Sequence, residues 1–163
     1  MHDLKITAPK DEPVIVMTRT FNAPRELVWK AISEPEHAVR WFGPHGHRNK
    51  VLKWDWKVGG EWSIETTIAN GDRIVFFGDY REIEKPKKVT QTFSFDQLPP
   101  GVHSLDTLEL IEKDGKTIYQ ATSRMPDFAA RDGMLASGME TGVVEGFERL
   151  DAMLEDFKAT TPA

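Results

Sequence analysis

The chain has 163 residues, of which 39% are hydrophobic and 29% are charged, and its formal net charge is -5. This length and balance are typical of one globular domain with a core large enough to fold unaided. The negative charge argues against nucleic acid as the main partner, and the absence of cysteine excludes disulfides and thiolate chemistry. No apolar run approaches the ~20 residues of a membrane span, so membrane insertion is not expected.

Three segments are expected along the chain. Residues 1–12 are polar and contain a proline, which predicts a flexible lead-in. A single domain is predicted over residues 13–158, and residues 159–163 are predicted to form a frayed tail. The N-terminal residues contain no apolar stretch of signal-peptide type, which predicts a cytoplasmic protein.

The first part of the domain predicts one strand and two short helices. β-branched residues over 14–21 are typical of a strand. Pro24 suits the first position of a helix, where its missing N–H would be unpaired in any case, and Pro35 ends that helix. A second short helix over residues 36–41 leads into a turn rich in glycine and proline.

Six further strands are predicted between residues 49 and 125. Alternating apolar residues and turn signals such as Asn70-Gly71 and Asp114-Gly115 divide this segment. The expected strands are 49–56, 61–69, 73–84, 87–95, 103–112 and 116–125. Because only short turns separate them, the sequence indicates an antiparallel meander rather than βαβ units.

A long helix is predicted over residues 131–158. Its apolar residues recur every three or four positions and form one stripe. Gly138, Gly142 and Gly146 flank that stripe, although each glycine weakens a helix by ~0.8–1.0 kcal/mol relative to alanine. We therefore expect the sheet or a bound molecule to approach the helix closely along this row. The alternative is that the missing side chains widen a cavity beside the helix.

The order of elements predicts an α+β fold in which one curved sheet of about seven strands wraps over the terminal helix. Such an arrangement leaves a wedge between sheet and helix. Wedges lined by apolar side chains and a few polar groups are where small ligands usually bind.

Several motifs resemble one family. Residues 19–44, RTFNAPRELVWKAISEPEHAVRWFGP, resemble the opening of the START-like, or SRPBCC, superfamily, within the branch named for the activator of heat-shock-protein 90 ATPase homologues. The resemblance rests on Phe21, Ala23-Pro24, Val28-Trp29, Pro35-Glu36, Trp41 and Gly43-Pro44. It extends through Gly59-Gly60 before Trp62, Gly78-Asp79-Tyr80 with Glu82-Ile83, and SGMETGVVEGFERLDAML, and so covers nearly the whole chain.

The resemblance implies a helix-grip fold with a cavity between the sheet and the C-terminal helix. Members of the superfamily bind lipids, polyketides, plant hormones or antibiotics, and some are cyclases or dehydratases. The eukaryotic namesakes of the branch bind and stimulate the chaperone. Fold does not by itself assign one of these functions.

Aromatic and flexible apolar residues are the candidates for the cavity wall. The predicted lining residues are Trp41, Trp54, Trp62, Phe76, Tyr80, Phe93, Met139, Val143 and Phe147. Each tryptophan would offer a large apolar face and one N–H group to a flat ligand. The alternative is that these residues only fill the core, as we expect for Trp29, Leu150 and Leu154.

Glu61, Arg124 and His45 are the candidates for polar groups of the cavity. An inward Glu61 would have a raised pKa and could form a polar pair with Arg124. A shift of one residue in strand register would turn both outward. His45 and His47 lie in a glycine- and proline-rich turn at the predicted rim, but a metal needs three or four converging ligands, so no metal or cofactor is predicted.

The sequence carries no nucleophile elbow, paired-carboxylate motif or phosphate-binding glycine loop, so no catalytic residue is predicted. The leading hypothesis is therefore a protein that binds a small hydrophobic or aromatic molecule. One alternative is a cyclase- or hydrolase-type enzyme that uses the same cavity, with Glu61 and Arg124 near the ligand. Another is an adaptor that binds a chaperone through the outer face of the sheet. A monomer and a homodimer paired through a sheet edge are both open.

Overall fold

The computed structural model describes residues 4–43 and 46–160, and in these residues it contains eight strands and four helices. The strands are β1 (Lys5–Thr7), β2 (Val14–Phe21), β3 (Arg48–Trp54), β4 (Glu61–Thr67), β5 (Arg73–Glu84), β6 (Lys88–Phe95), β7 (Ser104–Lys113) and β8 (Lys116–Arg124). The helices are α1 (Arg25–Ser33), α2 (Pro35–Trp41), α3 (Phe128–Ala136) and α4 (Met139–Thr160).

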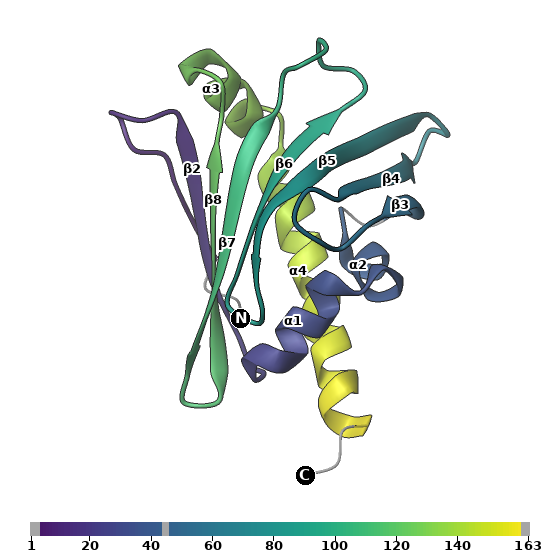
Figure 1. The fold of residues 1–163 in the computed structure, drawn as a ribbon, viewed down its shortest axis with the longest axis vertical. Coiled ribbons are helices and arrows are strands. Elements are labelled where there is room, and N and C mark those ends of the chain that lie inside the picture. Colours follow the sequence, from purple (N-terminus) through teal and green to yellow (C-terminus); the bar gives the residue numbers. More distant parts are fainter. Residues whose placement is uncertain (1–3, 44–45, 161–163) are drawn as a thin grey trace.

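All eight strands form one antiparallel sheet in the order β1-β2-β8-β7-β6-β5-β4-β3. Helices α1 and α2 connect β2 on one side of the sheet to β3 at the other edge, and β3 to β8 form the predicted meander (Figure 1). The pairing register shifts in β3 and again in β5, and such bulges bend the strands. The result is a curved, open sheet with α1, α2 and α4 on one face, which confirms the helix-grip prediction.

The sheet has one strand more than the seven predicted from the sequence. The additional strand, β1, lies inside the segment expected to be a lead-in, and its Ile6 pairs with Met17 of β2. Three residues are too few to show the alternation by which a strand is recognised in a sequence. The pairing along β2 therefore identifies β1, because the segment itself carries no strand pattern.

The prediction of one continuous helix over residues 131–158 is wrong at its N-terminal end. The chain forms α3 and α4, with Ser137 and Gly138 between them. Gly138 has a φ of 83°, a left-handed conformation that commonly ends a helix. The helix therefore ends before Gly138, and a new helix, α4, begins at Met139 although the apolar repeat continues.

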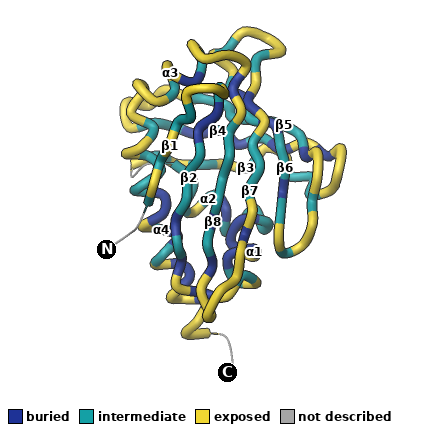
Figure 2. Tube along the Cα trace, turned by 90° about the vertical axis from the view of Figure 1, so that its left-hand side faces the viewer, coloured by how far each residue is buried: buried dark blue, intermediate teal, exposed yellow. Residues whose placement is uncertain are grey.

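The core lies between the inner face of the sheet and the helices. Phe21, Tyr119 and Phe147 form an aromatic centre in which the Phe147 ring lies 5.2 Å from Phe21 and 5.1 Å from Tyr119. Leu150 and Leu154 of α4 are buried, as predicted. Figure 2 shows buried and intermediate positions along β2 and β8 and exposed positions at the turns.

The close approach to α4 expected from its glycines occurs at Gly146. A Cβ placed there would lie 2.7 Å from the carbonyl oxygen of Trp41. The segment that approaches Gly146 is therefore the end of α2 and not the sheet. Gly146 allows α2 to pack its backbone directly on α4.

Candidate functional site

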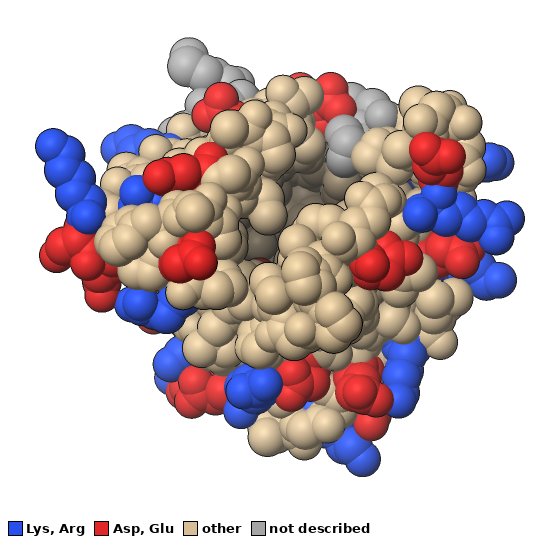
Figure 3. Space-filling model, turned by 90° about the horizontal axis from the view of Figure 1, so that it is seen from above, with Lys and Arg blue, Asp and Glu red and all other residues tan. Residues whose placement is uncertain are grey.

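A cavity of about 450 Å³ lies between the inner face of the sheet, the end of α2, and α4. Its volume falls within the range typical of sites for small molecules. Viewed from above, the molecule is hollowed between the sheet and the helices, and the rim of this hollow consists mainly of uncharged residues (Figure 3). Several acidic side chains stand around the opening, whereas basic side chains lie toward the edge of the outline.

All of the predicted lining residues except Phe76 lie around this cavity. They are Trp41, Trp54, Trp62, Tyr80, Phe93, Met139, Val143 and Phe147. The Phe76 side chain packs in an aromatic group with Phe42, Phe93 and Phe95 and does not contribute to the lining.

Trp54, Trp56 and Tyr80 form an aromatic wall on one side of the cavity. The rings of Trp54 and Trp56 are nearly parallel, with centroids 6.1 Å apart, and Tyr80 packs edge-on 4.9 Å from Trp56. Trp29, predicted to belong to the core, is buried behind this wall with its ring 5.7 Å from Trp56. The wall therefore presents flat apolar faces that are held in place by ring contacts.

The N–H groups of two cavity tryptophans are already used by the protein. Trp41 Nε1 donates to the carbonyl of Ala31 at 3.0 Å, and Trp54 Nε1 donates to the carbonyl of Ser33 at 3.0 Å. Both carbonyls belong to the last turn of α1, where helical carbonyls lack partners within the helix. The expectation that these N–H groups serve a ligand is therefore wrong, and the two side chains offer apolar ring surface.

A row of polar side chains crosses the inner face of the sheet opposite α4. Strand register places Tyr80 of β5 beside Gln91 of β6, Gln91 beside Asp106 of β7, and Asp106 beside Ser123 of β8. All four residues line the cavity, together with Ser104. Sequence reasoning missed this row, because a single carboxylate in a strand of mixed polarity looks like a solvated residue.

Asp106 is the one charged residue among the described lining residues. Its Oδ1 accepts hydrogen bonds from Ser123 Oγ at 2.6 Å and from Ser104 Oγ at 2.9 Å. Burial raises the pKa of Asp106, and the two serine hydroxyls lower it in part. The pKa of Tyr119 is also raised by burial and by the nearby charge of Asp106.

The α4 part of the lining comes from its N-terminal half. Met139, Val143 and Phe147 face the cavity, accompanied by Gly142 and Gly146. Three further methionines, Met17, Met125 and Met134, add flexible apolar surface from β2, the end of β8 and α3.

The polar residues predicted for the cavity lie elsewhere or outside the described part. Glu61 is exposed and pairs with Lys53 at 2.6 Å, whereas Arg124 pairs with Glu12 at 3.0 Å near the surface. Strand alternation turns both side chains to the outer face, so the predicted Glu61–Arg124 pair is wrong. His45 lies outside the described residues.

A second hollow of about 670 Å³ lies on the outer face of the sheet. It is lined by polar residues of β4 and β5 and by the loop between β6 and β7. Glu61 contributes to it, as do Asp79 and Arg81, which form an ion pair at 2.8 Å. Phe77 lines the same hollow and is 42% exposed.

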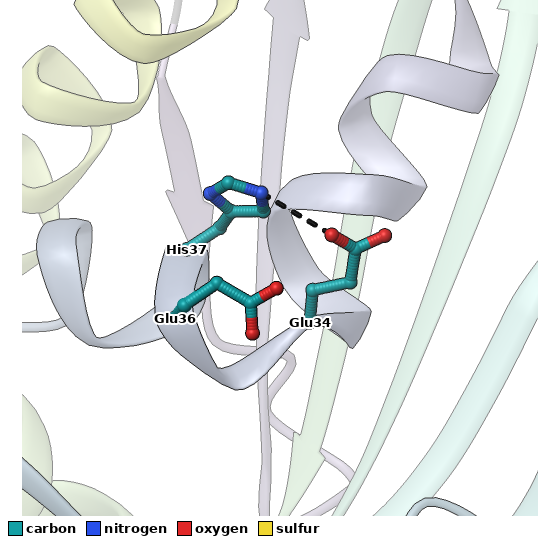
Figure 4. Close-up of side chains that lie close together, drawn as sticks. All are labelled: Glu34, Glu36 and His37. Atoms are coloured by element: carbon teal, nitrogen blue, oxygen red, sulfur yellow. Dashed lines mark ion pairs between the residues drawn. The ribbon is translucent and has the colours of Figure 1, made fainter.

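The start of α2 brings together Glu34, Glu36 and His37, whose ligand-type atoms lie within 4.8 Å of one another (Figure 4). His37 Nε2 pairs with Glu34 Oε1 at 3.2 Å, and the imidazole ring packs 4.9 Å from Phe157 of α4. These contacts explain the cluster as a link between α2 and its neighbours. None of the helices in the described part of the chain has the length and apolarity needed to cross a membrane.

Comparison with families identifies one match. A family model described as "Activator of Hsp90 ATPase homolog 1-like protein" matches residues 22–155. The comparison with curated proteins found no match.

Several solved structures share the fold. Protein Ms6760 from Mycobacterium smegmatis is 20% identical with a TM-score of 0.83, and the match covers 93% of this chain and 97% of that chain. A protein from Arthrobacter aurescens is 21% identical with a TM-score of 0.85, covering 93% and 91%. A protein from Rhodobacter sphaeroides is 23% identical with a TM-score of 0.84, covering 94% and 99%. At these identities the similarity establishes the fold alone.

Proposed function

The chain belongs to the activator of Hsp90 ATPase homolog 1-like family of the SRPBCC superfamily, and from that premise we propose that it binds a small apolar or aromatic molecule in the cavity between the sheet and α4. The observation that carries this proposal is the construction of the wall. Trp41 and Trp54 direct their N–H groups to carbonyls of α1 and leave ring surface for the cavity. An apolar ligand gains free energy there by leaving water.

The surrounding contacts support a preformed site. The aromatic wall is held by stacked and edge-on rings. Gly146 keeps α2 tight against α4, so the end of the cavity near Trp41 is fixed by backbone packing. A site that is already shaped loses little conformational entropy when a ligand binds.

The test is a thermal-shift screen of the purified protein against lipids, polyketides, flavonoids and aromatic drugs. A ligand at one hundred times its dissociation constant stabilises the folded state by ~2.7 kcal/mol, which raises Tm clearly. The variant Ala121→Phe should abolish the shift, because Ala121 lines the cavity. The matched variant Gln120→Phe, on the opposite face of β8, should keep it. A Tm shift that survives Ala121→Phe would place the ligand elsewhere. If no compound of the panel raises Tm, the proposal is rejected.

A second candidate is an adaptor that binds an Hsp90 chaperone. Two observations favour it: the description of the family, and the outer-face hollow in which Phe77 is 42% exposed. The chaperone's ATPase rate would be measured with the wild type, Ala121→Phe and Phe77→Ser. Stimulation that survives filling of the cavity and is lost on changing Phe77 supports the adaptor. The cyclase or hydrolase alternative receives no support from Glu61 and Arg124, which lie outside the cavity lining.

A further inference from the structure

One carboxylate oxygen in the cavity has no hydrogen-bond partner in the described part of the chain. Both serine hydroxyls bind Asp106 Oδ1, and no described residue donates to Oδ2. Asp106 lines the cavity and its Oδ2 is not fully enclosed by protein atoms, so this oxygen can accept a hydrogen bond from a bound molecule. The structure therefore presents an open acceptor in a mostly apolar wall.

No positive charge among the described lining residues balances this carboxylate. The other titratable lining residues are Tyr80 and Tyr119, whose pKa values are raised by burial, so both stay neutral near pH 7. The remaining polar side chains of the row, Gln91, Ser104 and Ser123, carry no charge. Because no described lining residue supplies a positive charge, Asp106 is neutralised in the cavity either by a proton or by a bound cation.

Resting on the proposed function, we infer that the ligand carries a cationic amine on an apolar or aromatic body and that Asp106 binds the ammonium group. The ammonium would donate to the free Oδ2, and charge-assisted hydrogen bonds of this kind are short and strong. The faces of Trp54, Trp56 and Tyr80 lie in the same lining and are suited to the body of the ligand or to its charge. Asp106 is therefore a specificity-determining residue of the cavity.

The raised pKa of Asp106 is consistent with a role in binding a cationic ligand. Burial raises the pKa of Asp106, so the ionised side chain costs folding free energy when the cavity is empty. A bound ammonium interacts favourably with the carboxylate and offsets that cost.

The negative net charge and the acidic side chains around the opening also favour the approach of a cation.

The experiment uses three probes that share a phenylalkyl body: 4-phenylbutylamine, pentylbenzene and 5-phenylpentanoate. Their dissociation constants would be measured by quenching of tryptophan fluorescence at neutral pH. The amine should bind the wild type ~10-fold or more tightly than pentylbenzene, in line with the strength of hydrogen bonds to charged groups, and the carboxylate should bind most weakly. Asp106→Asn should reduce the advantage of the amine to ~3-fold or less and strengthen binding of the carboxylate.

Asp79→Asn, on the outer face, is the matched control and should leave the order of affinities unchanged. Asp106→Ser serves as a second variant, and thermal melts verify that each variant is folded. If pentylbenzene binds the wild type as tightly as the amine, or if Asp106→Asn keeps the preference, the inference about Asp106 fails while cavity binding stands. If none of the probes binds and the broad ligand screen is also flat, the proposed function itself fails.

Discussion

Arg19 of β2 and Asp151 of α4, which lie 132 positions apart in the sequence, form a bidentate ion pair. Arg19 Nη1 donates to Asp151 Oδ1 at 2.6 Å and Nη2 donates to Oδ2 at 2.5 Å. The guanidinium also lies 4.4 Å from the ring centroid of Phe21 and 5.8 Å from that of Phe147. The pair therefore joins the C-terminal half of α4 to the sheet.

Asp151→Asn should destabilise the protein, because it leaves the Arg19 charge, which is only 4% exposed, without its counterion. The side chain of Asp151 is 43% exposed, so water compensates in part and the loss should fall below the ~3–5 kcal/mol typical of a fully buried pair. Denaturant unfolding measures the change. Asp156→Asn, on an exposed position of the same helix, is the control and should stay within ~0.5 kcal/mol of the wild type.

Gly146→Ala and Gly133→Ala should have opposite effects on stability. Alanine is ~1 kcal/mol better than glycine in a helix, and a Cβ at Gly133 of α3 meets nothing within 4 Å, so that variant should gain stability. A Cβ at Gly146 would press on the Trp41 carbonyl, and overpacking of this kind costs ~1–3 kcal/mol. Thermal unfolding of both variants checks the prediction. A rise in Tm for Gly146→Ala would show that α2 moves away without cost.

Asn49→Asp should loosen the connection between α2 and β3. Asn49 Nδ2 donates to the carbonyls of Val39 and Phe42, and Oδ1 accepts from Thr66. Aspartate keeps the acceptor but sets a second oxygen against two carbonyls, so we expect a loss of ~1–3 kcal/mol. Chemical denaturation gives the value. Lys50→Ala, at the exposed neighbouring position, should change the stability little. Equal losses of stability in the two variants would mean that the hydrogen bonds of the Asn49 amide contribute nothing specific.

Asp106→Asn and Asp79→Asn should respond to pH in opposite directions. Burial raises the pKa of Asp106 in the folded state. Its contribution to the stability of the folded state is therefore favourable below the pKa of the unfolded chain and is lost as pH rises through the folded-state pKa. Asp106→Asn should therefore have a higher Tm than the wild type near neutral pH, and the difference should shrink on acidification. The melts would be recorded between about pH 3 and pH 7. A lower Tm for Asp106→Asn near pH 7 would contradict the prediction.

The hydrogen bonds from Arg81 and Thr92 lower the pKa of Asp79, so its contribution to stability is present above the unfolded pKa and is lost as pH falls through the folded value. Asp79→Asn should have a lower Tm near neutral pH, and its deficit should disappear in acid. Because Asp79 is partly exposed, the deficit should be small. The same pH series of melts measures it, and a deficit that persists in acid would point to lost packing rather than charge.

The regular elements could be predicted because their signals are local. The range of β2 matched residue for residue, and so did that of β5, since alternating apolar residues and flanking turn residues mark a strand wherever it pairs. The break at Gly138 was missed because the apolar stripe continues across it from α3 into α4. Periodicity reports the buried face of a helix and carries no information on whether the helix is interrupted.

The family, the antiparallel meander and the aromatic character of the cavity could be predicted from the sequence, because motif, alternation and residue type are properties of neighbouring positions. Which polar groups face inward became clear from the fold. Glu61 and Arg124 turn outward, whereas Asp106 turns inward and lies beside Ser123 of the adjacent strand. The physical reason is that a register difference of one residue reverses every side chain of a strand, and register is fixed by pairing between segments far apart in the chain.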